Sequence, residues 1–231
     1  MKTENYAYQL FYFTSLLFIT ASIFMEHLSI FLKPVVLLLL SAIYILRAEH
    51  KNALVLIAMG VILVAEVLSM KDFIRYFRVL NVLLSVYYLL NIILLWKSLK
   101  KIKIRLNKVF TVQLIITMAL IVYVLASVAG LILPSVYDDR MYLVILILFF
   151  TVFVCSCYYI YLNSKTVVSS SLMVAASCFL IVNIITALYK LYVFLEVFMV
   201  IGNLLQVFGQ FFLVKFFIEQ HKLTPNEEDF F

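Results

Sequence analysis

"SIFLKPVVLLLLSAIYILR", residues 29–47, is an apolar run in which only Lys33 and the closing Arg47 carry charge. A helix needs ~20 mostly apolar residues to cross a hydrocarbon core of ~30 Å. Strands of a membrane β-barrel would instead alternate apolar and polar residues over ~10 positions, which this run does not do. The stretch therefore predicts a transmembrane helix that carries a lysine and a proline near its beginning.

The composition of the whole chain places it in the same class. Of its 231 residues, 66% are hydrophobic and 13% are charged, whereas soluble domains are ~45–50% apolar and ~25% charged. These values predict an integral membrane protein. Because the other apolar runs are also long and do not alternate, we expect an all-α, polytopic transmembrane helix bundle.

Charge and turn clusters divide the chain into eight predicted spans. We expect helices at 8–25, 29–47, 52–70, 73–96, 109–133, 141–163, 166–188 and 191–218. All but one of the connections are very short, so neighbouring helices should form antiparallel hairpins. The sequence predicts one eight-helix transmembrane domain over residues 1–220, followed by a short, disordered acidic tail at 221–231.

The basic residues predict the orientation, because loops rich in Lys and Arg stay in the cytoplasm. One side would hold twelve of them, six in the segment "KSLKKIKIRLNK" (97–108), and the opposite side would hold five. We therefore expect a multi-pass protein of the cell membrane with both termini in the cytoplasm. The basic segment serves as an orientation signal, although it could also lie on anionic lipid.

The usual motifs of metal, nucleotide and redox chemistry are missing. The three cysteines fall inside spans without CxxC spacing, and no HExxH, Walker or GxGxxG pattern occurs. We expect no cofactor, no metal site and no nucleic-acid partner.

Three ionisable residues inside the predicted spans are the candidates for function, because charge in a membrane is expensive and usually faces the bundle interior. Lys33 and Glu66 lie about one turn from the outer surface, and Glu196 about a turn and a half from it. We therefore expect the three to meet in a cavity in the outer half of the bundle.

Polar stripes on two helices extend this predicted cavity inward. Its expected lining consists of Pro34, Arg78, Asn81, Tyr88, Asn183, Asn203, Gln206 and Gln210. A structural alternative stands beside this interpretation: Lys33 and Glu66 can extend to water, and Asn and Gln can tie helices together at ~0.6 kcal/mol per bond.

The order of these features resembles the lysoplasmalogenase-like (YhhN-type) family of eight-helix membrane proteins. The "KP" at Lys33 and Pro34 is similar to a Lys-Pro that opens the family's second span. "VAEVL" places Glu66 where the family has an Asp, and "VFGQFFL" supplies Gln210 for an aromatic-x-x-Gln element of the eighth span.

Two departures affect groups that would do acid–base chemistry. Tyr87 or Tyr88 stands where the family has a His, and Cys178, after Ser177, stands where it has an Asp.

The resemblance implies hydrolysis of the vinyl-ether bond of a lysoplasmalogen, with a membrane lysophospholipid or ether lipid as substrate. This reaction needs an acid to protonate the alkene and a base to activate water. The candidates are Glu66 as acid/base, Glu196 as its counterpart, and Lys33, which would keep one of them ionised. The alternative is a non-catalytic lipid-binding, sensory or structural protein of the same fold; transport and ion conduction have less support.

Overall fold

The computed structural model describes residues 2–101, 108–164, 166–191 and 195–223. Within these ranges, eight helices are long and apolar enough to cross a membrane, which confirms the predicted all-helical fold and its eight spans. They are α1 (Lys2–Phe24), α2 (Glu26–Arg47), α3 (Ala53–Asp72), α4 (Phe77–Lys101), α5 (Lys108–Ile132), α6 (Arg140–Ser164), α7 (Val167–Leu191) and α8 (Glu196–Glu219). Two short 3-10 helices, η1 (Leu133–Asp139) and η2 (Gln220–Leu223), follow α5 and α8.

Most helix ends lie within three residues of their predicted positions, and the larger differences are at the beginning of α1, at both ends of α4, which runs from Phe77 to Lys101 instead of 73–96, and at the beginning of α8. α1 begins at Lys2 instead of residue 8, because polar residues ahead of the apolar run continue the helix. α8 begins at Glu196 instead of residue 191, which changes the position of that glutamate. Of the tail predicted to be disordered, 221–223 belong to η2 and 224–231 lie outside the described residues.

Two local features shape the helices that hold the site. Asn52 caps α3, because its side-chain oxygen accepts a hydrogen bond from the Leu54 amide at 3.0 Å. Pro34 is inside α2, more than two turns after Glu26, and not in the first turn. A proline there leaves the carbonyl four residues earlier, that of Ile30, without its helical partner.

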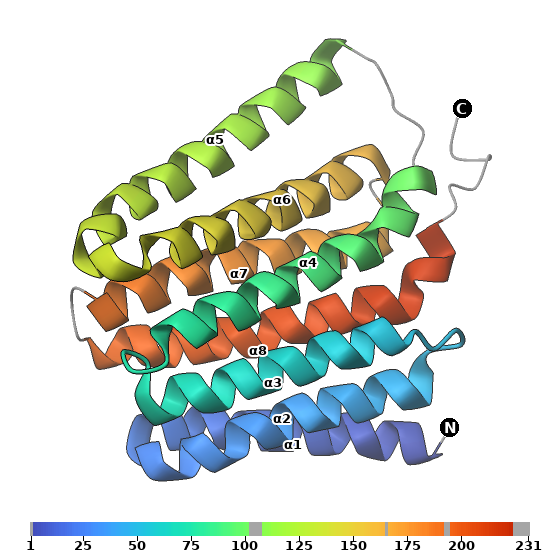
Figure 1. Cartoon of the computed structure of the whole chain (residues 1–231). Helices are drawn as coiled ribbons and strands as arrows, with labels where there is room; N and C mark the ends of the chain where they lie inside the picture. The colour runs from blue at the N-terminus through green and yellow to red at the C-terminus, as the bar shows by residue number, and fades with distance from the viewer. Residues whose placement is uncertain (1, 102–107, 165, 192–194, 224–231) are drawn as a thin grey trace.

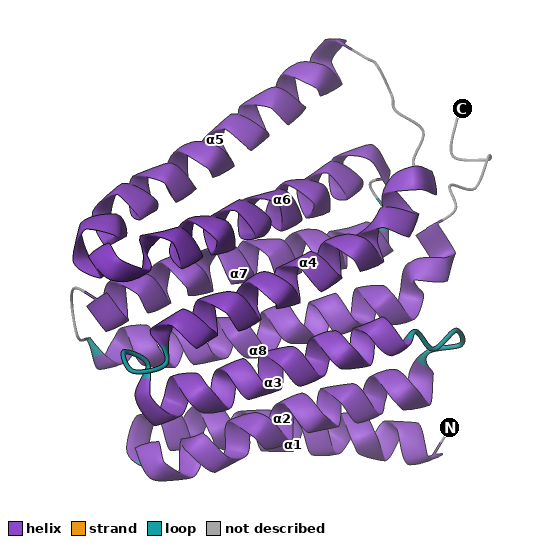
Figure 2. Cartoon of the chain, viewed as in Figure 1, coloured by secondary structure: helices purple, strands orange, loops and turns teal. Residues whose placement is uncertain are grey.

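Seven of the helices form a closed circuit of contacts, and α5 lies outside it (Figure 1). Along the circuit α1 packs on α2, α2 on α3, α3 on α4, α4 on α6, α6 on α7, α7 on α8, and α8 returns to α1 and α2. α5 packs mainly on α6. Helices that follow one another in the chain run in opposite directions (Figure 1 and Figure 2), so α4 and α6, which pack together, run in the same direction.

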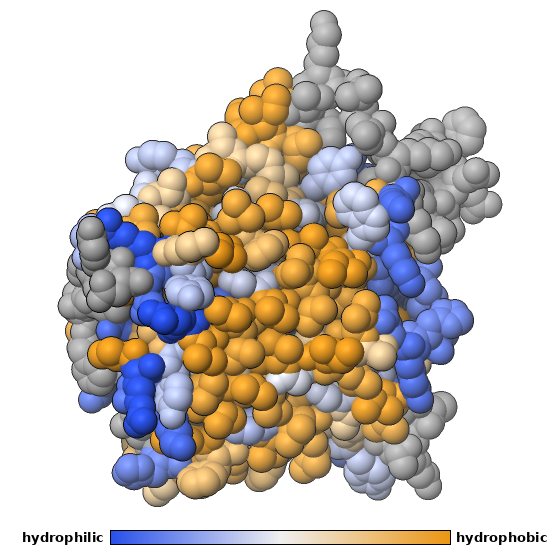
Figure 3. Space-filling model, viewed as in Figure 1, coloured by the Kyte–Doolittle hydropathy of each residue, from blue (hydrophilic) through white to orange (hydrophobic). Residues whose placement is uncertain are grey.

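The chain enters and leaves the bundle at the same end. In Figure 1 the beginning of α1 and the end of α8 both lie on the right, as an even number of spans requires. Figure 3 shows a wide hydrophobic band between two hydrophilic rims. This band matches the surface that a protein presents to the hydrocarbon of a bilayer.

The two ends of the bundle are filled differently. At the end that carries the termini, large apolar and aromatic side chains close the interior, among them Leu40, Tyr44, Leu95, Leu172 and Phe216, all fully buried. At the opposite end the helices enclose a polar cavity. The packed end supports the helices that position this cavity.

α7 and α8 make the most extensive helix contact, and a glycine lets them approach. A Cβ atom on Gly209 would lie 3.1 Å from the ring of Phe179 and 3.2 Å from the Cβ of Cys178, which is tighter than ordinary contact. This close packing fixes α8 so that Gln210, the next residue, stays in the interior.

Candidate functional site

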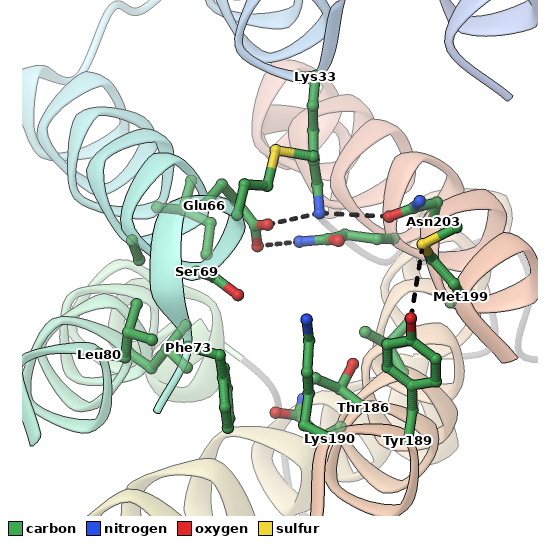
Figure 4. A pocket seen from close by; sticks show the side chains of 18 of the residues that line it. Lys33, Glu66, Ser69, Phe73, Leu80, Thr186, Tyr189, Lys190, Met199 and Asn203 are labelled. Atoms are coloured by element: carbon green, nitrogen blue, oxygen red, sulfur yellow. Dashed lines mark hydrogen bonds and ion pairs between the residues drawn. The ribbon is translucent and has the colours of Figure 1, made fainter. Parts of the chain in front are cut away.

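The cavity has a volume of about 180 Å³ and opens between five helices, α2, α3, α4, α7 and α8 (Figure 4). α7 and α8 close one side, and α2, α3 and α4 the other. Its polar lining residues are Ser29, Lys33, Glu66, Ser69, Tyr87, Tyr88, Asn183, Thr186, Tyr189, Lys190, Asn203, Gln206 and Gln210. We call this space the polar cavity.

An ion pair between neighbouring helices is the centre of the polar cavity. Lys33 of α2 and Glu66 of α3 approach to 2.5 Å between Nζ and Oε2, and each side chain is 11% exposed. The second carboxylate oxygen of Glu66 accepts a hydrogen bond from the amide of Gln206 on α8. Both oxygens of the carboxylate are therefore held by donors from different helices, which fixes the group in the cavity wall.

Asn203 extends this network to the first helix. Its side-chain oxygen accepts a hydrogen bond from Lys33 Nζ at 3.4 Å, and its nitrogen donates to the hydroxyl of Ser22 at 3.2 Å. The chain of polar contacts thus runs from α1 through α8 and α2 to α3.

A second polar layer lies deeper in the bundle. The Tyr87 hydroxyl donates to the side-chain oxygen of Gln210 at 3.1 Å, and the Asn183 nitrogen donates to the Tyr88 oxygen at 2.9 Å. Gln210 is 1% exposed, and its side-chain nitrogen has no hydrogen-bond partner within the described part of the chain. A buried donor without an acceptor is costly, so this end of the polar cavity favours a bound oxygen acceptor.

Seven of the residues predicted from the sequence lie together around this space. They are Lys33, Glu66, Tyr88, Asn183, Asn203, Gln206 and Gln210. They comprise a lysine, a carboxylate, a tyrosine and four amides, and they come from five helices.

Glu196 does not join them. It is the first residue of α8, it is exposed, and it is not among the residues that line the polar cavity. The prediction started the eighth span five residues too early, which put Glu196 inside the membrane-spanning helix. At the helix beginning its carboxylate instead lies where the helix dipole favours a negative charge.

Three further predicted lining residues also lie elsewhere. Arg78 is exposed and pairs with Asp139 at 2.9 Å, while its guanidinium lies 5.2 Å from the centre of the Tyr142 ring. Asn81 lines a different cavity and donates to the carbonyl of its own helix at Phe77. Pro34 does not line the polar cavity. Ile30, whose carbonyl lacks its helical partner because of Pro34, does line it.

The sequence interpretation missed several residues of the polar cavity. Lys190 lies beyond the predicted seventh span (166–188), but it extends from the last turn of α7 into the cavity on the side opposite Lys33 (Figure 4). Ser69 and Thr186 also line it. Asn183, Thr186 and Lys190 follow one another at i, i+3 and i+7, so a search for a polar face on α7 would have found them.

The polar cavity offers hydrogen-bond donors and one carboxylate, and its composition differs from that of a metal site. Within the described ranges no group of three His, Cys, Asp or Glu side chains lies close enough to hold a metal ion. The described cysteines, Cys155, Cys157 and Cys178, are free thiols. Ser177, at the position where the resemblance placed a Ser-Asp pair, contacts the hydroxyl of Tyr158 at 2.8 Å and does not line the cavity.

In the described part of the chain, these features define a membrane protein with eight helices long enough to span a bilayer and a polar cavity at the end of the bundle opposite the beginning of α1 and the end of α8. Comparison with protein-family models, with curated proteins and with solved structures gives no match. The resemblance to lysoplasmalogenase-like proteins therefore stays a prediction from the sequence.

Proposed function

We propose that the protein binds the polar head group of a single-chain membrane lipid in the polar cavity. The observation that supports this most is the cluster of Lys33, Glu66 and Gln206 inside an apolar bundle. Ionisable groups within a membrane are expensive to keep, and they usually mark a binding site or a pathway. A ligand site of this kind is a concave space with a few placed polar groups, as here.

The size and the chemistry of the polar cavity suit a head group. An apolar cavity of ~150 Å³ is enough to hold benzene, and the polar cavity has about 180 Å³. Glycerol or a phosphoethanolamine group is of this order. The amide of Gln210 at the inner end and Lys190 on the side opposite Lys33 are donors for hydroxyl or phosphate oxygens.

The proposal includes the orientation of the protein in the membrane. With both termini in the cytoplasm, the polar cavity lies in the outer half of the membrane, because it is at the end of the bundle opposite the termini. The excess of Lys and Arg on the terminal side supports this. A topology reporter fused after Gln220 should read as cytoplasmic, and an external reading would reverse the orientation.

A lysoplasmalogenase-like hydrolase is the second candidate, and Glu66 is the residue that favours it. It is the one carboxylate among the described residues that line the polar cavity, and Lys33 and Gln206 orient it. Hydrolysis of a vinyl ether needs an acid and a base. Glu196, the proposed counterpart, is exposed and outside the cavity, so Glu66 would have to serve both steps. We therefore favour binding over hydrolysis.

Purified protein in nanodiscs tests both candidates in one experiment. A lysoplasmalogen and a saturated lysophosphatidylethanolamine are titrated while thermal unfolding and aldehyde release are measured. We expect both lipids to raise the unfolding temperature, and we expect no aldehyde. Lys190→Gln should weaken this stabilisation, because it removes a charged donor at the polar cavity.

Glu66→Gln and Asp139→Asn make a matched pair of variants for the catalytic question. Both convert a carboxylate to an amide, one inside the polar cavity and one at the exposed pair with Arg78. Aldehyde release that Glu66→Gln abolishes and Asp139→Asn retains would establish the hydrolase instead. If neither lipid shifts the unfolding temperature and no aldehyde appears, the lipid proposal fails in both forms.

A further inference from the structure

A second cavity lies beside the polar cavity, and its lining is mostly hydrocarbon. It has a volume of about 110 Å³ and is enclosed by α4, α5, α6 and α7. α5 contributes Leu125, Val128, Ala129 and Ile132. Only Asn81, Asn183 and Thr186 are polar among its lining residues. We call this space the apolar cavity.

The two cavities are separated by side chains. Five residues line both of them: Phe73, Leu80, Leu84, Asn183 and Thr186. Figure 4 shows Phe73, Leu80 and Thr186 across the polar cavity from Lys33. α4 packs mainly on α3 and α6, and α7 packs mainly on α6 and α8, so α4 and α7 meet chiefly through side chains such as Tyr88 and Asn183. The two cavities are thus divided by side chains, and a change of side-chain rotamer costs less than the movement of a helix.

The helix on the far side of the apolar cavity is the one held most loosely. Only 17% of the α5 span is buried, against 33–44% of the other seven spans. α5 packs on α6, η1 and α7 and makes no extensive contact with α4 (Figure 1). Its described buried residues, Ile121, Leu125 and Ile132, all lie in its second half, next to the apolar cavity. The seam between α4 and α5 therefore faces bilayer hydrocarbon directly.

We propose that the apolar cavity holds the first methylene groups of the lipid chain whose head group occupies the polar cavity, and that the chain continues into the bilayer between α4 and α5. This inference rests on the proposed head-group site and adds the place of the hydrocarbon chain: the apolar cavity and the seam between α4 and α5. About 110 Å³ is less than the ~150 Å³ that holds benzene, so only a short part of a chain fits. The same volume leaves no room in the apolar cavity for a second chain beside the first.

The test fills the apolar cavity without touching the polar one. Ala129→Phe places a ring in the apolar cavity from α5, and Ala126→Phe places the same ring on the exposed side of the same helix. Each variant is titrated in nanodiscs with palmitoyl lysophosphatidylethanolamine and with chainless glycerophosphoethanolamine. The chain reaches the apolar cavity from the bilayer and not from water, so the expected loss of affinity comes from steric overlap between the new ring and the chain, and extra volume in a packed space is costly. We therefore expect Ala129→Phe to weaken the palmitoyl lipid at least about tenfold and to leave the chainless compound unchanged, while Ala126→Phe changes neither.

The outcomes separate this inference from the head-group proposal. Binding of the palmitoyl lipid by Ala129→Phe with wild-type affinity would overturn the chain site and leave the head-group site standing. If the wild-type protein binds neither compound, both proposals fail. If Ala129→Phe does not fold, the chain site is tested on the wild-type protein by cross-linking with a lysolipid that carries a photoreactive group near its carbonyl. Cross-links within residues 125–132 or 143–150 support the apolar cavity, and cross-links confined to α1 or α2 overturn it.

Discussion

Two ion pairs at the same end of the bundle have similar distances and very different surroundings. Lys33 and Glu66 are 2.5 Å apart, and each side chain is 11% exposed. Arg78 and Asp139 are 2.9 Å apart, with side chains 59% and 25% exposed. The first pair is inside the polar cavity and the second is at the surface. The comparison teaches that exposure, and not distance, decides how much the loss of one partner costs.

The physical reason is the solvation of the remaining charge. When one member of a buried pair is removed, the other stays in a place of low polarity and loses its compensation. At the surface, water replaces the lost partner, and the net contribution of the pair is only ~0–1 kcal/mol.

Lys33→Met should have the largest effect. It leaves the Glu66 carboxylate inside the bundle with Gln206 as its remaining donor. We expect the free energy of unfolding, measured in mixed detergent micelles, to fall by ~3–5 kcal/mol.

A double variant sharpens this prediction. Lys33→Met combined with Glu66→Gln should recover a large part of the lost stability, because no uncompensated charge is left. If the double variant is as unstable as the sum of the two single variants, the two residues are not coupled and the pair does not exist in the membrane.

Glu66→Gln should have an intermediate effect, about 1–3 kcal/mol on the same measurement. The lysine that remains keeps its hydrogen bond to Asn203, and its long stem can bring the ammonium toward water at the outer end of the cavity. Glutamate is too short for this, so Glu66→Gln should cost less than Lys33→Met. Equal losses in the two variants would show that Lys33 has no route to water.

Arg78→Met should reduce the free energy of unfolding by less than about 1 kcal/mol. Asp139 is left at the surface, where water solvates it. A part of the loss would come from the contact of the guanidinium with Tyr142. Arg78→Lys, which keeps the charge, separates this contact from the ion pair. A loss as large as that of Lys33→Met would contradict the comparison.

Added salt should have the smallest effect on the coupling energies of the two ion pairs. Raising the ionic strength to ~1 M shortens the Debye length to ~3 Å. The coupling between Arg78 and Asp139, measured by a double-mutant cycle, should then decrease toward zero. The coupling between Lys33 and Glu66 should change little, because few ions reach a cavity inside the bundle. A parallel decrease of both couplings would indicate that the polar cavity is open to bulk solvent.

The span number and the pairing of Lys33 with Glu66 were predictable from the sequence. Long apolar runs define membrane helices, and counting residues from a shared surface gives the depth of each side chain at about 1.5 Å per residue. Lys33 and Glu66 lie in adjacent helices joined by a hairpin, so equal depth was sufficient to bring them together. The amides of α8 were found in the same way, through their spacing on one face.

The errors arose where a helix boundary or a helix contact decided the outcome. Glu196 was placed inside a span because an apolar stretch before it resembled a helix start, whereas α8 begins at Glu196 itself. Arg78 and Asn81 share a helix with Tyr88 but do not share the polar cavity with it. The rotation of α4 depends on its packing against α3 and α6, and one sequence does not contain that information in its spacing.

The chain order of the polar cluster has a consequence for biogenesis. Lys33 and Glu66 belong to consecutive helices, so they leave the ribosome close together. A lysine alone in a membrane-inserting helix costs ~2.5–3.5 kcal/mol at the helix centre, which is an upper bound for Lys33 near the end of its helix. Gln206 follows Glu66 by 140 residues, which at ~5–20 residues per second is roughly 7–28 s of synthesis. The α2–α3 hairpin can therefore pair its lysine with its glutamate during translation, and α8 is added afterwards to a site whose two charges already compensate each other.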